Sequence, residues 1–136
     1  MKLEIVVEAS GLPLGMAVAA ADVSENELLM PALDDVPVEL PTGVPVIADK
    51  GHDSDALRDD LEEAGFQPII PHRRNRVRPS RNDGRRLRRY RHRWVIERTN
   101  AWLHCYRGLA TRWARYTFMY IGLVYLAFIQ MALQRF

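Results

Sequence analysis

The sequence predicts an α/β fold with helices layered on a small sheet, and the spacing of apolar residues along the chain is what predicts it. Residues 2–7 alternate between apolar and polar side chains, which is typical of a half-buried strand. Residues 44–48 form a short apolar run without alternation, which favours a central strand buried on both faces. Strands followed by helix–strand–helix alternation indicate a layered α/β architecture.

Turn and capping signals place the first elements. A turn at residues 9–11 joins strand 2–7 to a second strand over 12–20, so the chain is expected to open with a hairpin. Ser24 and Glu27 have the spacing of a capping box, which predicts a helix over about 25–35.

The later elements follow from the same kind of signal. Asp53 or Ser54 is expected to cap a helix that runs through Ala64, and Gly65 suits its end. The expected elements beyond it are a strand over 66–70, an arginine-rich loop over 71–84, a long helix over about 85–107 and a final helix over 117–135.

Length and composition bound the class of protein. The chain has 136 residues, the size of one domain, and its 48% hydrophobic content excludes an intrinsically disordered chain. The single cysteine excludes a disulfide framework and a cysteine-based zinc cluster. Residues 117–134 carry no charge but barely reach the ~20 residues of a membrane span. We therefore expect a buried C-terminal helix over 117–135, no membrane partner, and, without a signal peptide, a cytoplasmic protein.

The net charge of +2 conceals an asymmetry between the two halves of the chain. Residues 1–71 hold 3 Lys and Arg against 15 Asp and Glu, whereas residues 72–115 hold 15 Arg against two acids, Asp83 and Glu97. Segment 72–115 is therefore expected to bind the phosphate backbone of a nucleic acid. The alternative is a disordered basic loop that neutralises the acidic half within the molecule. Trp94, Val95, Trp102 and Leu103 are expected to be core or helix-packing residues rather than stacking platforms for bases.

Two carboxylates stand out as candidate metal ligands. Asp49 ends the predicted buried strand, where side chains of an open α/β sheet converge on a crevice, and a carboxylate there suits Mg²⁺. Alternatively, Asp49 only begins a turn with Lys50 and Gly51. Glu97 lies in the arginine-rich helix, where helical geometry places Tyr90, Arg93, Glu97 and His104 on one stripe. The alternative for Glu97 is an ion pair with Arg93 or Arg98 on a solvated face.

These residues also carry a family resemblance. Ile47-Ala48-Asp49-Lys50-Gly51-His52-Asp53-Ser54 resembles the A-D-K-G-Y-D-S segment of bacterial insertion-sequence transposases of the DDE type. Tyr90, Arg93 and Glu97 match the Y-x2-R-x3-E part of the signature of those transposases. The run 91–99, R-H-R-W-V-I-E-R-T, is similar to a run found in one large group of them. The resemblance extends from about Leu3 to the C-terminus.

The resemblance implies an RNase H-like mixed sheet with flanking helices, and Mg²⁺- or Mn²⁺-dependent cutting and joining of DNA ends during transposition of an insertion sequence. Asp49 matches the second catalytic and metal-binding carboxylate and Glu97 the third. The signature lysine falls on His104, so phosphate positioning is expected from His104 or a neighbour such as Arg107. The DNA-contacting residues expected in all are Arg73, Arg74, Arg76, Tyr90, Arg93, His104 and Arg107.

The first aspartate of the family lies on a strand before the opening hairpin, and the sequence begins inside that hairpin. We therefore expect a partial catalytic domain over 1–136, the C-terminal part of a transposase, inactive alone because it carries two of three carboxylates. It would be either a remnant of an element or the second frame of a two-frame element. Its expected partners are DNA and either the upstream-frame polypeptide or another transposase chain. The resemblance implies a bacterial, nucleoid-associated location. The rival interpretation is a non-enzymatic arginine-rich DNA-binding module that inhibits transposition; a membrane-associated basic protein is a weaker third.

Overall fold

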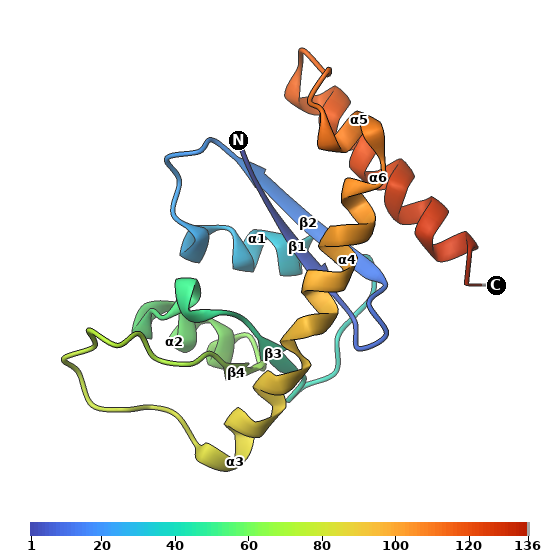
Figure 1. Cartoon of the computed structure of the whole chain (residues 1–136). Coiled ribbons are helices and arrows are strands. Elements are labelled where there is room, and N and C mark those ends of the chain that lie inside the picture. The colour runs from blue at the N-terminus through green and yellow to red at the C-terminus, as the bar shows by residue number, and fades with distance from the viewer. Residues whose placement is uncertain (136) are drawn as a thin grey trace.

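The structure, a computed structural model that describes residues 1–135, contains two small sheets with helices around them (Figure 1). Strands β1 (Lys2–Val7) and β2 (Pro13–Ala19) pair antiparallel. Strands β3 (Pro45–Ile47) and β4 (Gln67–Ile69) pair in parallel. The mixed α/β class is as expected, but the hydrogen-bonded strands form two separate pairs rather than one mixed sheet.

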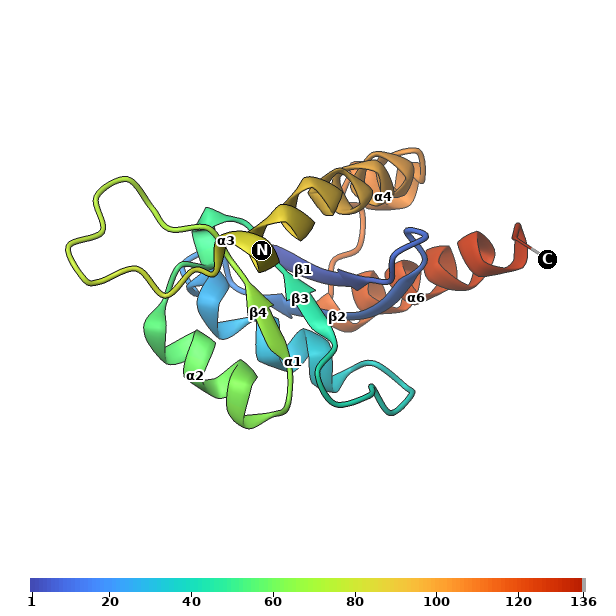
Figure 2. The same cartoon turned by 90° about the horizontal axis from the view of Figure 1, so that it is seen from below.

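The helices lie on both sides of the strands. Figure 2 shows the strands between α4 on one side and α1 and α2 on the other. The α-helices are α1 (Leu29–Asp34), α2 (Asp55–Glu63), α3 (Gly84–Leu87), α4 (Trp94–His104), α5 (Arg107–Ala110) and α6 (Thr117–Leu133). Three 3-10 helices, η1 (Glu25–Glu27), η2 (Lys50–His52) and η3 (Arg88–Arg93), join or precede them.

The helix expected over 25–35 is divided in two. Ser24 accepts a hydrogen bond from the amide of Asn26, not from that of Glu27, and η1 forms before α1 begins at Leu29. Pro31 explains the division, because proline lacks an amide proton and fits only the first turn of an α-helix. An α-helix beginning at Glu25 would place Pro31 in its interior.

The long helix expected over 85–107 is also divided, into α3, η3 and α4, and the chain turns again before α5. The segment η3 has the sequence Arg-Arg-Tyr-Arg-His-Arg, so like charges lie close together along it. Such charges are unfavourable at three- and four-residue spacing and at the N-terminal end of a helix dipole. Repulsion among these arginines accounts for the tighter turns before α4.

One buried cluster packs α1 and α2 against the ends of β3 and β4. It consists of Leu29, Leu33, Ala48, Leu57, Leu61 and Ile70, with Val6 of β1 and Val46 of β3 packed against it. Leu61 and Ile70 have no exposed surface. This cluster fixes the end of β3, and therefore the position of Asp49, against the two acidic helices.

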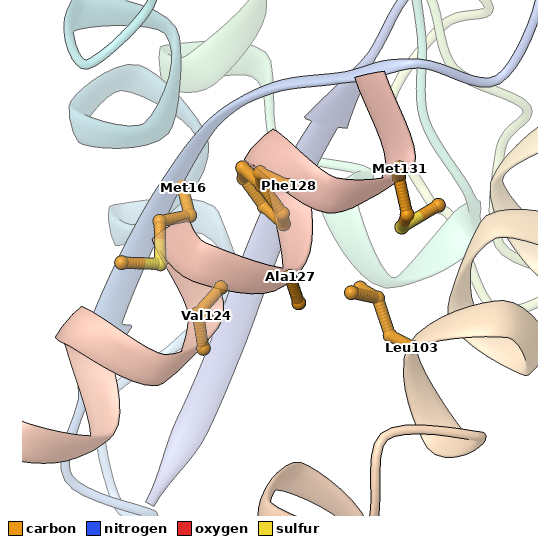
Figure 3. Close-up of a cluster of buried hydrophobic side chains, with 6 residues drawn as sticks. All are labelled: Met16, Leu103, Val124, Ala127, Phe128 and Met131. Atoms are coloured by element: carbon orange, nitrogen blue, oxygen red, sulfur yellow. The ribbon is translucent and has the colours of Figure 1, made fainter. Parts of the chain in front are cut away.

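A second cluster joins α6 to β2 and α4 (Figure 3). Its residues are Met16, Leu103, Val124, Ala127, Phe128 and Met131, of which the last four follow the three- and four-residue spacing of one helix face. The opposite face of α6 is exposed at Phe118, Leu126, Ile129 and Leu133. The helix is thus buried along one face only. Among the described residues no helix is long and apolar enough to cross a membrane.

Replacement of Gly15 by alanine is expected to destabilise the hairpin. A Cβ at this position of β2 would lie 2.6 Å from the carbonyl oxygen of Ala32 and 3.0 Å from the amide nitrogen of Val36. Relief of this overlap requires a backbone shift that costs about 1–3 kcal/mol. Urea unfolding of Gly15→Ala measures this loss. Gly122→Ala is the matched control, since its Cβ would meet no atom within 4 Å in α6; an equal loss in both variants would contradict the explanation.

Candidate metal and nucleic-acid site

Asp49 stands directly after β3, at the point where the strand ends in the tight turn η2. The amide of Ala48 still donates to the carbonyl of Ile69 at 3.2 Å, so the chain keeps its pairing with β4 up to the residue before Asp49. Asp49 is extended, and its Oδ1 accepts a 2.8 Å hydrogen bond from the amide of Gly51. The aspartate is therefore both a turn-forming residue and a carboxylate at the carboxyl end of a parallel strand.

The imidazole of His52 lies beside Asp49 and is almost fully buried, with 7% of its side chain exposed. Its Nδ1 is 3.1 Å from Oδ1 of Asp49. Its Nε2 is 3.4 Å from Oε1 of Glu4 on β1, which is long for a hydrogen bond, and has no other partner among the described residues. Burial lowers the pKa of His52, but Glu4 and Asp49 together outweigh burial, and the net shift of the pKa is upward.

Glu25 completes a small group of oxygen and nitrogen donors around Asp49. One ligand atom each from Glu25, Asp49 and His52 lies within 4.8 Å of the others. Gly51 leaves room between the two carboxylates, because a Cβ there would stand 2.5 Å from Oε2 of Glu25 and 2.8 Å from Oδ1 of Asp49. Such donors fit a hard divalent cation.

Glu97 lies on α4 and is paired with an arginine. Its Oε1 is 2.9 Å from Nη2 of Arg93, and Nη1 of Arg93 is 3.0 Å from the hydroxyl of Tyr90. Three of the four residues expected on one stripe are therefore joined through Arg93, although η3 is not an α-helix, and His104 makes no such contact within the described residues. In this structure Glu97 therefore forms the ion pair with Arg93 that the sequence offered as the alternative to a metal ligand.

Arg93 links the two candidate carboxylates electrostatically. Its pKa is raised first by the hydrogen bond that it donates to Tyr90, and also by the charges of Glu97 and Asp49. Both carboxylates thus act on the same guanidinium. The group of donors around Asp49 contains Glu25 and His52 but not Glu97.

A buried carboxylate, Asp53, organises the start of the arginine-rich loop. Its side chain is 3% exposed and its Oδ1 lies 2.6 Å from Nη1 of Arg58, which is equally buried. The same oxygen is 3.0 Å from Nδ1 of His72, and Oδ2 accepts a 2.7 Å hydrogen bond from the amide of Arg73. Hydrogen bonds from Arg73 and His72, with Arg58 nearby, more than offset burial and hold the pKa of Asp53 well below its usual range.

Asp55 holds the rest of this loop. It accepts hydrogen bonds from Arg76 at 2.9 Å and from Arg78 at 3.3 Å, and these contacts lower its pKa. Arg81 reaches Asp59 at 2.8 Å. The loop is therefore bound to the acidic α2. Part of the arginine run thus neutralises acidic residues within the molecule, as the alternative interpretation of the sequence expects.

The residues expected to contact DNA fall into two groups. Arg73 and Arg76 are engaged inside the molecule, since Nε of Arg73 donates to the carbonyl of Lys50 at 2.8 Å and Arg76 is bound to Asp55. Arg74, His104 and Arg107 are exposed, and in residues 1–135 no ion pair or side-chain hydrogen bond engages them.

The two tryptophans of α4 are not core residues. Trp94 is 51% and Trp102 39% exposed, and the guanidinium of Arg98 lies over both rings, 4.7 and 4.8 Å from their centres. Val95 and Leu103, on the neighbouring face, are buried as expected. The difference is one of helix phase, because residues 94, 98 and 102 lie four apart on a stripe beside the buried one, and Arg98 on that stripe reaches the hairpin turn at the carbonyl of Ser10.

Sequence reasoning missed Glu25, His52 and Asp53. Glu25 lies in the capping segment that follows Ser24, and no local spacing relates His52 to Glu4. Asp53 was considered as a helix cap, but Ser54 caps α2. The available signal was the density of acids in 49–55 opposite the arginine-rich loop.

Comparisons with known proteins identify the family of the chain. The family described as Transposase DDE domain has a model that matches residues 1–131. That span covers both Asp49 and Glu97, and the chain belongs to this family of transposase domains.

A relative supports the same assignment. The chain is 37% identical over 121 residues to a Burkholderia cepacia protein named "Putative transposase for insertion sequence element IS402". The match covers 84% of this chain and 54% of that protein, so the chain spans about half the length of its relative. No solved structure matches the chain.

Replacement of Asp53 by asparagine is expected to lower the free energy of unfolding by about 3 kcal/mol at pH 7, because it removes the nearer countercharge of the buried Arg58 and leaves only Asp55 at 3.6 Å. Asp53 has a lowered pKa in the folded state. It therefore stabilises the wild-type above about pH 4, and this contribution is lost as the pH falls. Urea unfolding at several pH values should show less acid sensitivity in Asp53→Asn.

The control for this prediction is Asp83→Asn. Asp83 is exposed, caps α3 and lies 3.7 Å from Arg86. Asparagine caps as well as aspartate, so a change within about 0.5 kcal/mol is expected. Equal losses in the two variants would mean that the buried ion pair is not a major source of stability.

Proposed function

We propose that this chain is the C-terminal part of a transposase catalytic domain, in which Asp49 and Glu97 hold a divalent metal ion, Mg²⁺ or Mn²⁺, for cleavage and joining of DNA strands. The observation that carries this proposal is the position of Asp49, at the carboxyl end of a parallel strand in a chain of this family. The strand–turn–helix order after Asp49 agrees with an RNase H-like arrangement.

The contacts of Asp49 suit a metal ligand. Its Oδ1 is engaged by the amide of Gly51 and lies beside Nδ1 of His52, whereas within the described residues no donor contacts Oδ2. Ligating carboxylates in proteins are commonly oriented in this way. A bound divalent ion would polarise a phosphodiester and activate water or a 3′-hydroxyl.

Glu97 requires a change of partner before it binds a metal. Arg93 neutralises it at 2.9 Å. A DNA phosphate is a strong competitor for an arginine, because guanidinium–phosphate contacts are forked and charge-assisted. DNA binding would therefore draw Arg93 from Glu97 and free the carboxylate next to the cleavage site.

A third carboxylate is proposed to come from a further strand. Within residues 1–135, β1 pairs only with β2 and β3 only with β4, so each has an edge without a partner. Unpaired edges accept another strand through backbone hydrogen bonds. The upstream-frame polypeptide, another transposase chain or a preceding part of a longer protein would supply it. The 136-residue chain alone is then expected to bind DNA without cutting it.

DNA contacts are assigned to side chains that the fold leaves outward. These are Arg74, His104 and Arg107, with Tyr90 and Arg93 adjoining Glu97, while Arg73 and Arg76 hold the loop in place. Both DNA ends and target DNA present the same phosphate backbone, so affinity is expected to depend on salt more than on sequence. In a bacterial cell such binding would place the chain at the nucleoid.

Metal binding tests the proposed function directly. Titration of the chain with Mn²⁺, followed by electron paramagnetic resonance of the free ion, is expected to show a site weakened at least tenfold in Asp49→Asn. Glu97→Gln is expected to weaken Mn²⁺ binding when DNA is present and to leave it little changed without DNA, because Arg93 occupies Glu97 in the free chain. Asp59→Asn, on the outer face of α2, is the control.

Strand cleavage tests the need for a third carboxylate, and Mn²⁺ binding distinguishes the transposase fragment from a non-enzymatic DNA-binding module. With terminal-repeat DNA and Mg²⁺ or Mn²⁺, no cleavage by the chain alone is expected. Robust cleavage that disappears in Asp49→Ala would contradict the need for a third carboxylate. An Mn²⁺ affinity that is unchanged when Asp49 is replaced would instead favour the DNA-binding module.

Arg74→Ala is expected to weaken DNA binding without loss of stability. The side chain is exposed, so its removal should lower affinity for all sequences and reduce the slope of log K against log salt by about 1. Arg76→Ala should instead lower the melting temperature, because it breaks the contacts with Asp55. Fluorescence anisotropy with duplex DNA at several salt concentrations, together with thermal unfolding, checks both. A stable Arg76→Ala that binds DNA as poorly as Arg74→Ala would contradict this division.

A further inference from the structure

The buried imidazole of His52 lies between carboxylates from two distant parts of the chain. Nδ1 faces Asp49, at the end of β3, and Nε2 faces Glu4, in the middle of β1. We propose that His52 is a positioning residue for Asp49, fixing its carboxylate so that Oδ2 faces the metal. The inference rests on the proposed metal-binding role of Asp49.

The first step of the argument is the geometry at Asp49. Two groups approach the same oxygen, the amide of Gly51 at 2.8 Å and Nδ1 of His52 at 3.1 Å. An Asp carboxylate rotates broadly about its terminal bond when it is free. Two contacts on Oδ1, from a backbone group and from a buried ring, restrict that rotation and direct Oδ2 outward. The amide alone would fix the oxygen but not the plane of the carboxylate.

The second step is the restraint on the ring itself. His52 is the buried residue of η2, and its side chain is 7% exposed. Glu4, whose side chain is 20% exposed, stands on the other side of the imidazole at 3.4 Å from Nε2. The hydrogen bond at Nδ1 and the burial of the ring restrict its orientation, and the approach of Nε2 to Glu4 places the hairpin next to the turn that carries Asp49.

The third step separates positioning from ligation. A histidine that binds a metal needs one nitrogen directed at the ion, while the other donates to a neighbouring group. Here Nδ1 is directed at Asp49 and Nε2 at Glu4, so each nitrogen faces a carboxylate. The ring therefore acts on the metal through Asp49.

The experiment compares Mn²⁺ affinity by electron paramagnetic resonance in the full chain and four variants. His52→Phe keeps a ring without nitrogens, and its Mn²⁺ affinity is expected to fall about 10- to 100-fold, the usual effect of removing the partner of a metal ligand. His52→Gln keeps one donor for Asp49 but cannot also reach Glu4, so a smaller loss is expected. Glu4→Gln should also lose affinity, and exposed His92→Gln should match the wild-type.

Nuclear magnetic resonance of the imidazole nitrogens provides a readout that a purely structural role would not move. Addition of Mg²⁺ is expected to shift the His52 ring signals in the wild-type and to leave them unchanged in Asp49→Asn. With ¹¹³Cd²⁺ in place of Mg²⁺, no direct nitrogen–cadmium coupling is expected. A direct coupling to His52 would overturn the inference and make His52 a ligand.

The outcomes separate this inference from the proposed function. If Asp49→Asn binds Mn²⁺ as the wild-type does, the proposed metal site is wrong. If Asp49→Asn loses affinity while folded His52→Phe and Glu4→Gln retain it, only the positioning role is wrong. Should His52→Phe fail to fold, as judged by circular dichroism, His52→Gln and Glu4→Gln carry the test, and full affinity in both overturns the inference.

Discussion

The contact between Asp53 and Arg58 is the constraint on which the arrangement of the site depends. Both side chains are 97% removed from solvent, and their closest atoms are 2.6 Å apart. A charge buried to this degree is stable only with its countercharge and hydrogen bonds in place. The remaining donors of Arg58 and acceptors of Asp53 are satisfied by Ile70, His72 and Arg73. The pair therefore joins α2, the end of β4 and the arginine-rich loop at one point.

This junction determines which arginines remain outside. The first part of the loop is drawn against α2, whose acids neutralise Arg76, Arg78 and Arg81. Arg73, anchored through its backbone to Asp53, extends its side chain to the carbonyl of Lys50 and so supports the turn after Asp49. Most arginines of residues 73–81 thus hold the loop in place, whereas Arg74 among them is exposed and makes no ion pair within the described residues.

The two strand pairs have a related consequence. Each pair is a minimal sheet, and the clusters around α2 and α6 supply the burial that two strands alone cannot. Val6 of β1 and Val46 of β3 pack against one cluster, so side chains connect the pairs where backbone hydrogen bonds do not. The relative is about twice as long as the span it shares with this chain. Among the described residues each strand pair has edges without a partner. This agrees with the proposal that further polypeptide completes the domain.

Much of the fold was readable from the sequence. Alternation over residues 2–7 identified β1, and the apolar run over 44–48 located β3. The expectation of a central strand buried on both faces was wrong, because β3 is partly exposed and pairs only with β4 among the described residues. The motif around Asp49 and the Tyr90–Arg93–Glu97 spacing indicated the family, since both are local in the chain. Helix boundaries at Pro31 and in η3 were missed, although proline position and like charge were visible.

Only the tertiary structure determined which polar and charged side chains pair with one another. Glu4 and His52, or Asp53 and His72, are far apart in sequence, and no periodicity relates them. The phase of α4 likewise turned Trp94 and Trp102 to solvent because Val95 and Leu103 faced the core. Local patterns record whether a residue is buried and in which element it lies. The partner of a buried charge depends on how those elements pack, and packing is a property of the whole chain.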